Sequence, residues 1–188
     1  MMPEDLQTGS FTHINFAFAL IDPITFQVAP MASSGAAISQ EELYKRTTAL
    51  KENAPGLLVW ISIGGWSMND ADQPTFHTFS KLASSLQAQE KLSDSLLSFM
   101  QTYGFDGVDI DWEYPAAVER GGKSTDYGDY VLWLTNLRTA LGRNYGLSIT
   151  LPSSYWYMRN FAIVEIAKIV DWFNVSLSTL LISSEGRH

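Results

Sequence analysis

The sequence predicts an α/β fold, in which helices cover a parallel β-sheet. Strand-like and helix-like stretches alternate along the chain, which is the order expected of repeated strand–helix units. The strand candidates are continuous apolar runs, such as Gly-Leu-Leu-Val-Trp-Ile-Ser-Ile at 56–63, and such runs are typical of strands buried on both faces. No internal repeat or interdomain linker is visible, and 188 residues suggest one domain.

The first half of the chain is predicted to contain two strands, at 12–20 and 56–63, and two helical regions. Ser-Gln-Glu-Glu at 39–42 has the spacing of a capping box, so a helix is expected to run from there towards residue 53. Residues 75–103 carry helical periodicity with a break near Ser84 and Ser85, and Gly104 is a good C-cap.

The second half continues the alternation. Its predicted elements are a strand at 105–112, a polar Gly-rich loop at 120–125, a helix at 127–141 with Tyr130, Leu134, Leu137 and Leu141 on one stripe, a strand at 147–151, a helix at 162–170 and the start of a strand at 171–175. These make five strand candidates in the whole chain. A closed eight-unit barrel usually needs about 250 residues, so on length alone an open sheet remains possible.

Composition excludes several classes of function. Lys and Arg number 12 and Asp and Glu number 20, so the net charge is −8, which argues against a phosphate-binding surface and hence against nucleic acid as a partner. No long apolar run is present, so no membrane-spanning helix is expected. The start, Met-Met-Pro-Glu-Asp, lacks the basic and apolar regions of a signal peptide. The chain has no cysteine and therefore no disulfide or thiolate site, which leaves the redox compartment open.

The most informative segment is Phe-Asp-Gly-Val-Asp-Ile-Asp-Trp-Glu-Tyr-Pro at 105–115. Asp109, Asp111 and Glu113 alternate with apolar residues, so on a strand all three carboxylates share one face. Carboxylates that lie close together repel one another, and burial increases that cost. The arrangement suits a site where one carboxyl group must keep its proton near neutral pH.

The acidic strand has two other possible interpretations. It could be the solvated edge of an exposed strand, but Val108, Ile110 and Trp112 indicate a strand inside a sheet. It could bind Mg²⁺ or Ca²⁺, which carboxylates suit. No histidine lies near to complete a zinc site, and the surrounding aromatic residues fit a sugar better than a metal. We therefore expect neither a metal nor another cofactor.

The acidic segment from Asp106 to Pro115 resembles the active-site motif of glycoside hydrolase family 18, the chitinases and their relatives. Ser-Ile-Gly-Gly-Trp-Ser at 62–67 resembles the second signature of this family, and residues 12–19 resemble its second barrel strand. Residues 147–157 and 170–174 resemble the fifth strand and the start of the sixth. The similarity is closest to the fungal-type chitinases and covers about residues 10–175.

The resemblance implies a (β/α)₈ TIM barrel, of which this chain would hold only about strands 2 to 6. The first strand should precede residue 10, and the sixth should continue into a Met-x-Tyr-Asp pattern that is not present. We therefore expect residues 1–188 to form a single incomplete catalytic domain, truncated at both ends, with a divergent tail at 176–188. Two open sheet edges would follow, and open edges tend to pair with other chains.

The resemblance also implies roles for the acidic residues. Glu113 would be the general acid, Asp111 would orient the N-acetyl group of the substrate, and Asp109 would share a proton with Asp111. The nucleophile would be the acetamido oxygen of the substrate. Ser62 would donate a hydrogen bond towards the inner aspartate, although a serine here could instead cap a strand carbonyl.

Substrate contacts are expected from the glycine turn and from nearby aromatic residues. Gly64 and Gly65 would let the substrate approach the backbone closely. Trp66 is favoured for stacking on a sugar ring, whereas Phe18 and Tyr114 could equally be core residues. Tyr155 and Trp156 are weaker candidates, and Trp112, which points away from the acids, is expected in the core.

The predicted function is therefore hydrolysis of β-1,4 N-acetylglucosamine linkages in chitin, with chitin or chitooligosaccharides as the partner. The alternatives are a catalytically inactive chitin-binding protein, an endo-β-N-acetylglucosaminidase and a metal-dependent hydrolase. Family members are often extracellular, but this N-terminus gives no export signal. The sequence does not indicate the localisation or the oligomeric state.

Overall fold

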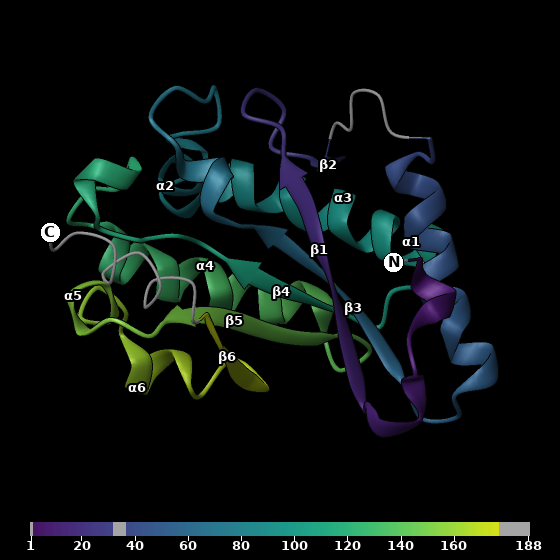
Figure 1. Cartoon of the computed structure of the whole chain (residues 1–188). Coiled ribbons are helices and arrows are strands. Elements are labelled where there is room, and N and C mark those ends of the chain that lie inside the picture. Colours follow the sequence, from purple (N-terminus) through teal and green to yellow (C-terminus); the bar gives the residue numbers. More distant parts are fainter. Residues whose placement is uncertain (1, 32–36, 177–188) are drawn as a thin grey trace, which may run out of the picture.

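A single curved sheet forms the centre of the computed structural model, which describes residues 2–31 and 37–176 (Figure 1). The strand order is β2-β1-β3-β4-β5-β6. Neighbouring strands are parallel from β1 to β6, and only the short β2 runs antiparallel to its neighbour β1. The strands are β1 (His13–Ile21), β2 (Val28–Pro30), β3 (Leu58–Gly64), β4 (Gly107–Asp111), β5 (Gly146–Pro152) and β6 (Trp172–Ser176).

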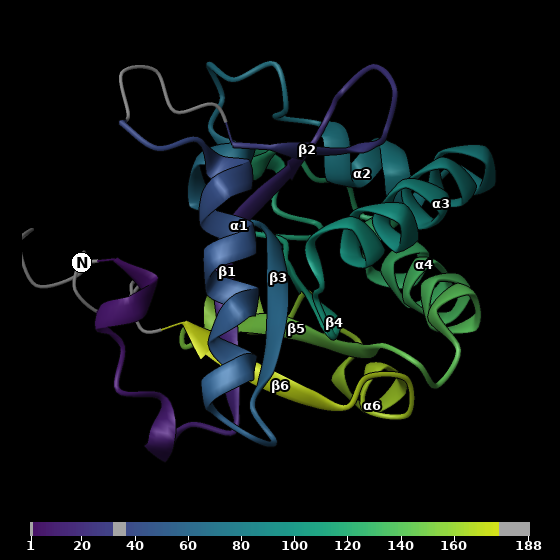
Figure 2. The same cartoon turned by 90° about the vertical axis from the view of Figure 1, so that its right-hand side faces the viewer.

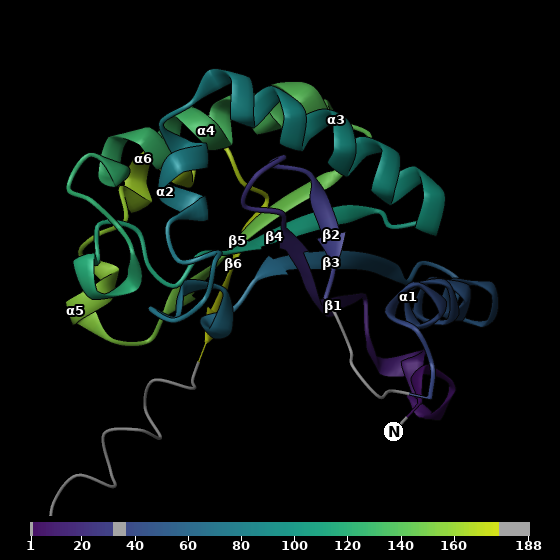
Figure 3. The ribbon, with the colours of Figure 1, turned by 90° about the horizontal axis from the view of Figure 1, so that it is seen from above.

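Helices cover the outer face of the sheet. Seen from above, α2, α3, α4 and α6 follow its curve on one side, and α1 continues the layer beside β3 (Figure 3). Figure 2 shows α1 running along β1 and β3. The helices are α1 (Gln40–Ala49), α2 (Thr78–Ala83), α3 (Leu86–Tyr103), α4 (Asp126–Leu141), α5 (Tyr155–Met158) and α6 (Ile163–Ile166). No helix in the described ranges is long and apolar enough to cross a membrane.

The predicted α/β architecture is confirmed, with five parallel strands close to the expected positions. The helix start expected at Ser39 is confirmed, because the Ser39 hydroxyl caps α1 by accepting the backbone N–H of Glu42 at 3.2 Å. Gly104 ends α3 in the left-handed conformation, with a φ of 78°. The helix predicted at 162–170 is shorter, since α6 ends at Ile166 and the chain turns into β6; β-branched residues are frequent there and weaken a helix. The tail from 177 to 188 lies outside the described residues.

The hydrophobic core lies between the sheet and the helices. On β3, β4 and β5 the outward residues are apolar, and side chains from α2, α3 and α4 pack on them. Trp112 is 1% exposed and stacks on Phe79 with ring centroids 5.4 Å apart, so its predicted place in the core is confirmed. The core residues of these strands are Val59, Ile61, Ile63, Val108, Ile110, Leu147, Ile149 and Leu151.

Towards the other face of the sheet, one tryptophan occupies space left by two glycines. Trp60 is paired with Gly107 in the parallel register, and Gly107 is paired with Gly146. A Cβ atom would lie 2.5 Å from the Trp60 indole at Gly107 and 1.8 Å from it at Gly146. The indole also stacks on Trp172 of β6, with centroids 4.2 Å apart. Glycine is therefore needed at both positions to admit this indole.

An aspartate precedes β4 and another precedes β6, and each binds the start of the preceding strand. Asp106 accepts the N–H of Val59 at 2.8 Å, and Asp171 accepts the N–H of Leu147 at 2.7 Å. Each also pairs at 2.8 Å with a cation, Lys51 for Asp106 and Arg138 for Asp171.

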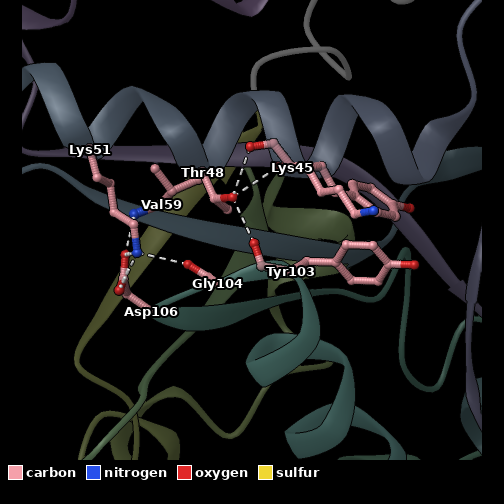
Figure 4. Close-up of polar contacts among 8 residues, drawn as sticks. Lys45, Thr48, Lys51, Val59, Tyr103, Gly104 and Asp106 are labelled. Carbon is pink, nitrogen blue, oxygen red and sulfur yellow. Dashed lines mark hydrogen bonds and ion pairs between the residues drawn. The ribbon is translucent and has the colours of Figure 1, made fainter.

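Figure 4 shows the first of these arrangements. Lys51 also donates to the Gly104 carbonyl at 2.7 Å, and the nearby Thr48 hydroxyl donates to the Tyr103 carbonyl at 2.6 Å. The end of the α1 region is thereby tied to the end of α3. These contacts fix the amino-terminal ends of the strands. The acidic residues of the sequence motif lie towards the opposite, carboxyl-terminal ends.

Candidate active site

The three acids of the sequence motif lie together at the carboxyl end of β4. Asp109 and Asp111 point to the face away from the helices, opposite Ser62 and Gly64 of β3. Glu113 lies just beyond the last residue of β4, so it belongs to the following loop and not to the strand itself. All three are buried, with exposed fractions of 1% for Asp109, 6% for Asp111 and 5% for Glu113. The alternation in the sequence thus brings three carboxyl groups into one place.

Asp109 is surrounded by four hydrogen-bond donors, which come from three other strands of the sheet. Oδ1 accepts from Ser148 at 2.7 Å and from Asn174 at 2.9 Å. Oδ2 accepts from Ser62 at 2.8 Å and from Thr150 at 2.9 Å. The expected hydrogen bond from Ser62 is confirmed. Four donors match the acceptor capacity of an ionised carboxylate, so Asp109 is held as an acceptor. The proton expected to be shared between Asp109 and Asp111 stays a prediction.

Asp111 lies in a very different environment. Burial raises its pKa to about 8, and the negative charges of Glu113 and Asp109 add to the effect. Its Oδ1 atom is buried without a hydrogen-bond partner among the described residues. The protonated form of Asp111 is therefore favoured, and no protein group among the described residues occupies its Oδ1 atom.

Glu113 has the environment of a general acid. Burial raises the pKa of its carboxyl group, while a hydrogen bond from Tyr114 and the charge of Arg120 act in the opposite direction. Its Oε2 atom is buried and, within the described part of the chain, makes no hydrogen bond. A raised pKa favours the protonated form that a general acid needs, and no described protein group competes for this oxygen.

The glycine turn after β3 passes close to β4 and to the Phe18 ring. Gly64 has a φ of 120°, and a Cβ atom there would lie 2.2 Å from the carbonyl oxygen of Asp111. At Gly65, with a φ of 86°, a Cβ atom would lie 3.0 Å from the Phe18 ring. The Gly65 N–H donates to the Asp111 carbonyl at 3.0 Å. Glycine at both positions therefore lets β3 pass close to the acids, and the expected contact of this turn with a substrate stays a prediction.

Trp66 follows this turn and is 40% exposed. Arg120, from the loop after β4, lies over the indole with its guanidinium carbon 3.7 Å from the ring centroid. Phe18 is half-buried, lies against Gly65, and its carbonyl accepts hydrogen bonds from Gln40 and Tyr44, both at 3.2 Å. Of these two aromatic candidates, Trp66 has the larger accessible surface and is the better placed to stack on a sugar.

Tyr114 lies at the site but is 1% exposed. Its ring stacks on that of Tyr157, with centroids 4.2 Å apart, and forms a T-shaped pair with Trp66, with centroids 6.4 Å apart. The ring therefore supports its neighbours and offers no open face to a sugar. Tyr155 and Trp156, the weaker candidates, are both exposed, and Arg159 covers one face of Trp156 at 4.0 Å.

Ser148, Thr150, Asn174 and Arg120 belong to the site but were not singled out from the sequence. Ser148 and Thr150 alternate with apolar residues in Leu-Ser-Ile-Thr-Leu at 147–151, so their shared face was readable. Asn174 and Arg120 carry no comparable local signal, because their partners are distant in the sequence.

A cavity of about 530 Å³ lies at the opposite, amino-terminal end of the strands, away from the acids. Its lining includes Trp60, Asp106, Arg138 and Trp172. The acids and the exposed aromatic rings are at the other end, which is where barrels of this kind carry their sites. No group of three or more His, Asp or Glu residues in the described part of the chain is arranged to hold a metal ion.

Comparison with known proteins gives consistent results. The sequence model for glycosyl hydrolases family 18 matches residues 2–178. Chitinase A1 of Niallia circulans is 35% identical over 136 residues, which cover 67% of this chain and 18% of that protein.

Solved structures of the same class have the same fold. Catalytic domain 2 of the Group II chitinase of Ostrinia furnacalis has a TM-score of 0.79 at 26% identity, covering 93% of this chain and 45% of that one. A mutant of that domain, in complex with penta-N-acetylchitooctaose, has a TM-score of 0.78 at 26% identity with the same coverage. The chain thus spans less than half the length of these relatives, and it matches part of their barrel.

Proposed function

Because the chain belongs to the glycosyl hydrolases of family 18, we propose that it acts as a chitinase, which hydrolyses the β-1,4 links between N-acetylglucosamine units. The observation that carries this proposal is the environment of Glu113: a buried carboxyl group with a raised pKa, beside a second buried acid, at the carboxyl end of a parallel strand. The named relatives support the choice of chitin as the substrate class.

Glu113 is proposed to donate its proton to the glycosidic oxygen. As the bond between that oxygen and the anomeric carbon breaks, the acetamido oxygen of the same sugar attacks the anomeric carbon and closes a ring. Glu113, now a carboxylate, accepts a proton from water, and that water opens the ring and restores the acetamido group. Two displacements at the anomeric carbon give retention of configuration.

Asp111 is proposed to accept a hydrogen bond from the N–H of the acetamido group and so to orient that group. Its free Oδ1 atom is the group available for this contact. Asp109, held by its four donors, has a fixed position on the same face of β4 as Asp111. Ser62, Ser148, Thr150 and Asn174 then act by keeping Asp109 in place.

The first prediction concerns turnover of chitotetraose by the chain. We expect release of reducing ends, and Glu113→Gln should lower kcat by at least about 10²-fold, the usual contribution of a general acid. Since the amide keeps the shape of the side chain, binding of chitotetraose measured by calorimetry should remain. The exposed Glu90→Gln on α3 is the matched control, with unchanged turnover.

Each outcome of this experiment has a distinct meaning. Turnover by the Glu113→Gln variant would refute the role of Glu113. Binding of chitotetraose without release of reducing ends by the unaltered chain would instead favour a sugar-binding protein. Absence of both would refute chitin as the ligand.

A further inference from the structure

Arg120 is a buried arginine that the proposed reaction does not use. It is 6% exposed and lies at the end of a short 3₁₀ segment, Val118–Arg120, in the loop between β4 and α4. A buried guanidinium group is costly unless its N–H groups are all bound. In this structure its three nitrogens each bind a different acceptor, and the acceptors belong to two different loops.

The acceptors connect Arg120 to both parts of the site. Nε donates to the backbone carbonyl of Glu113 at 3.0 Å, and Nη2 donates to the backbone carbonyl of Trp66. Nη1 pairs with Asp70 at 2.8 Å, and the flat face of the guanidinium lies on the Trp66 indole. One side chain thus contacts the backbone of the proposed acid and both the backbone and the ring of the proposed sugar platform.

The loop around Arg120 is itself fixed by buried polar contacts. Asn69 donates to the Arg120 carbonyl at 3.2 Å. Asp126, which is fully buried, accepts the N–H groups of Ala116 and Lys123 at 3.2 and 2.8 Å and the hydroxyl of Ser80 at 2.7 Å. The guanidinium group is therefore placed by the fold before any ligand binds.

We propose that Arg120 is a positioning residue, which holds the sugar-binding face of Trp66 and the backbone of Glu113 as one rigid unit. Arg120 covers one face of the indole, and Trp66 remains 40% exposed. The inference rests on the proposed function for the meaning of Glu113, because a misplacement of about 1 Å at a reacting group can cost about 10²-fold in rate. The link between Arg120 and Trp66 stands independently of catalysis.

The first test measures the Trp66 indole and needs no ligand. The chain is labelled with ¹⁵N, the Trp66 indole N–H signal is assigned by Trp66→Phe, and its {¹H}–¹⁵N NOE is recorded. Arg120→Met, which keeps length and removes all donors and the charge, should turn a rigid indole into a mobile one on the ps–ns timescale. Arg120→Lys keeps a cation above the ring and should restore part of the rigidity.

The matched control is Arg138→Met at the opposite end of the strands. Arg138 likewise binds backbone carbonyls and an aspartate: Ile169 and Tyr145 at 3.0 Å, Gly142 at 3.4 Å and Asp171 at 2.8 Å. Its loss should lower the free energy of unfolding while leaving the Trp66 signal unchanged. An equally rigid Trp66 indole in Arg120→Met, or an equal loss of rigidity in Arg138→Met, would overturn the proposal.

The second test is kinetic and separates the two ends of the link. With chitotetraose, Arg120→Met should lower kcat about 10- to 100-fold through Glu113 and raise KM through Trp66. Trp66→Ala should raise KM, and adding Arg120→Met to it should raise KM no further, because the second change would act through a ring already removed. Independent, additive effects on KM would contradict the link.

Asp70→Asn provides a milder variant if Arg120→Met does not fold. It removes the ion pair but keeps the donors to Glu113 and Trp66, so kcat should fall only two- to threefold. A chain that shows no turnover at all would count against the proposed function, whereas the NMR test would still decide the role of Arg120.

Discussion

Asp109 and Asp111 are two residues apart on β4, yet their hydrogen-bonding environments are opposite. Asp109 accepts four hydrogen bonds from Ser62, Ser148, Thr150 and Asn174. Asp111 has a pKa of about 8, because burial and two neighbouring acids oppose its ionisation. Pairs of acids whose environments separate their protonation states are a frequent basis of acid–base catalysis.

The raised pKa of Asp111 predicts a dependence of stability on pH. Its pKa is about 8 in the folded chain against an ordinary value of 3.8, so the folded state binds the proton more tightly. Stability is therefore greatest below about pH 4 for this group, and it is lost as pH rises towards about 8. Asp111→Asn cannot ionise, so its melting temperature should exceed that of the unaltered chain more at pH 8.5 than at pH 5.

The measurement is a thermal unfolding series at the two pH values, in which about 1 kcal/mol corresponds to about 2–4 °C for a chain of this size. The exposed Asp94→Asn serves as the control, and the difference in its melting temperature between the two pH values should match that of the unaltered chain. A difference between variant and unaltered chain that is the same at both pH values would count against this account of Asp111.

The hydrogen bond from Thr150 to Asp109 can be tested by replacing the threonine hydroxyl with a methyl group. Thr150→Val keeps the shape of the side chain but removes a hydrogen bond to a charged acceptor, so urea unfolding should show a loss of about 1.5–3 kcal/mol. Thr150→Ser keeps the hydroxyl and should lose less. Equal losses in the two variants would mean that packing, not the hydrogen bond, stabilises this position.

At the scale of elements, the packing of β3, β4 and β5 depends on two positions without a side chain as much as on the large side chain beside them. Gly107 and Gly146 leave the space that Trp60 fills, and Trp172 closes it from β6. Glycine in a strand often marks a close approach of another group. Here the group is an indole, so the small and the large residue are required together.

This packing predicts a strong coupling between two strands. Gly146→Ala would place a Cβ atom 1.8 Å from the Trp60 ring, so we expect a loss of stability of at least about 1–3 kcal/mol on urea unfolding. In a Trp60→Leu background the same change should cost much less, because the ring is gone. A cost that is unchanged in that background would show that the strand rejects alanine for another reason.

The strands were predictable because their signal is local. Runs such as Leu-Leu-Val-Trp-Ile-Ser-Ile and the alternation around Asp109 can be read from neighbouring residues. β2, with three residues, and α5, with four, are too short to produce a periodic pattern and were not predicted. The contacts of Arg120 with Trp66 and Asp70 span some 50 residues, so they follow from the way two loops meet, which no local pattern encodes.

At the scale of the whole molecule, the described strands form an arc with two unequal edges. β1 pairs with β2 only between Ala19 and Ile21, so much of its outer edge has no partner in the described residues. β6 pairs with β5, and no strand of the described part of the chain pairs with its other side. Unpaired edges present backbone donors and acceptors to other chains.

Self-association through these edges is therefore expected. Sedimentation velocity should show a larger average mass as the concentration of the chain rises. Val175, on the outer strand β6, is 57% exposed, and Val175→Lys should reduce the association because a charge at an edge opposes pairing. A monomer at all concentrations would refute the expectation.

The four donors on Asp109 also have a consequence for how the chain reaches its fold. They come from β3, β5 and β6 and converge on one carboxylate of β4. A slip of β5 by one residue would turn Ser148 and Thr150 to the helix side and bring leucine and isoleucine against a buried charge. The carboxylate that is proposed to take part in the reaction thus also raises the free energy of misaligned strands. Asp109 therefore favours one register of the strands. Selection for catalysis at this residue would at the same time have selected for that register.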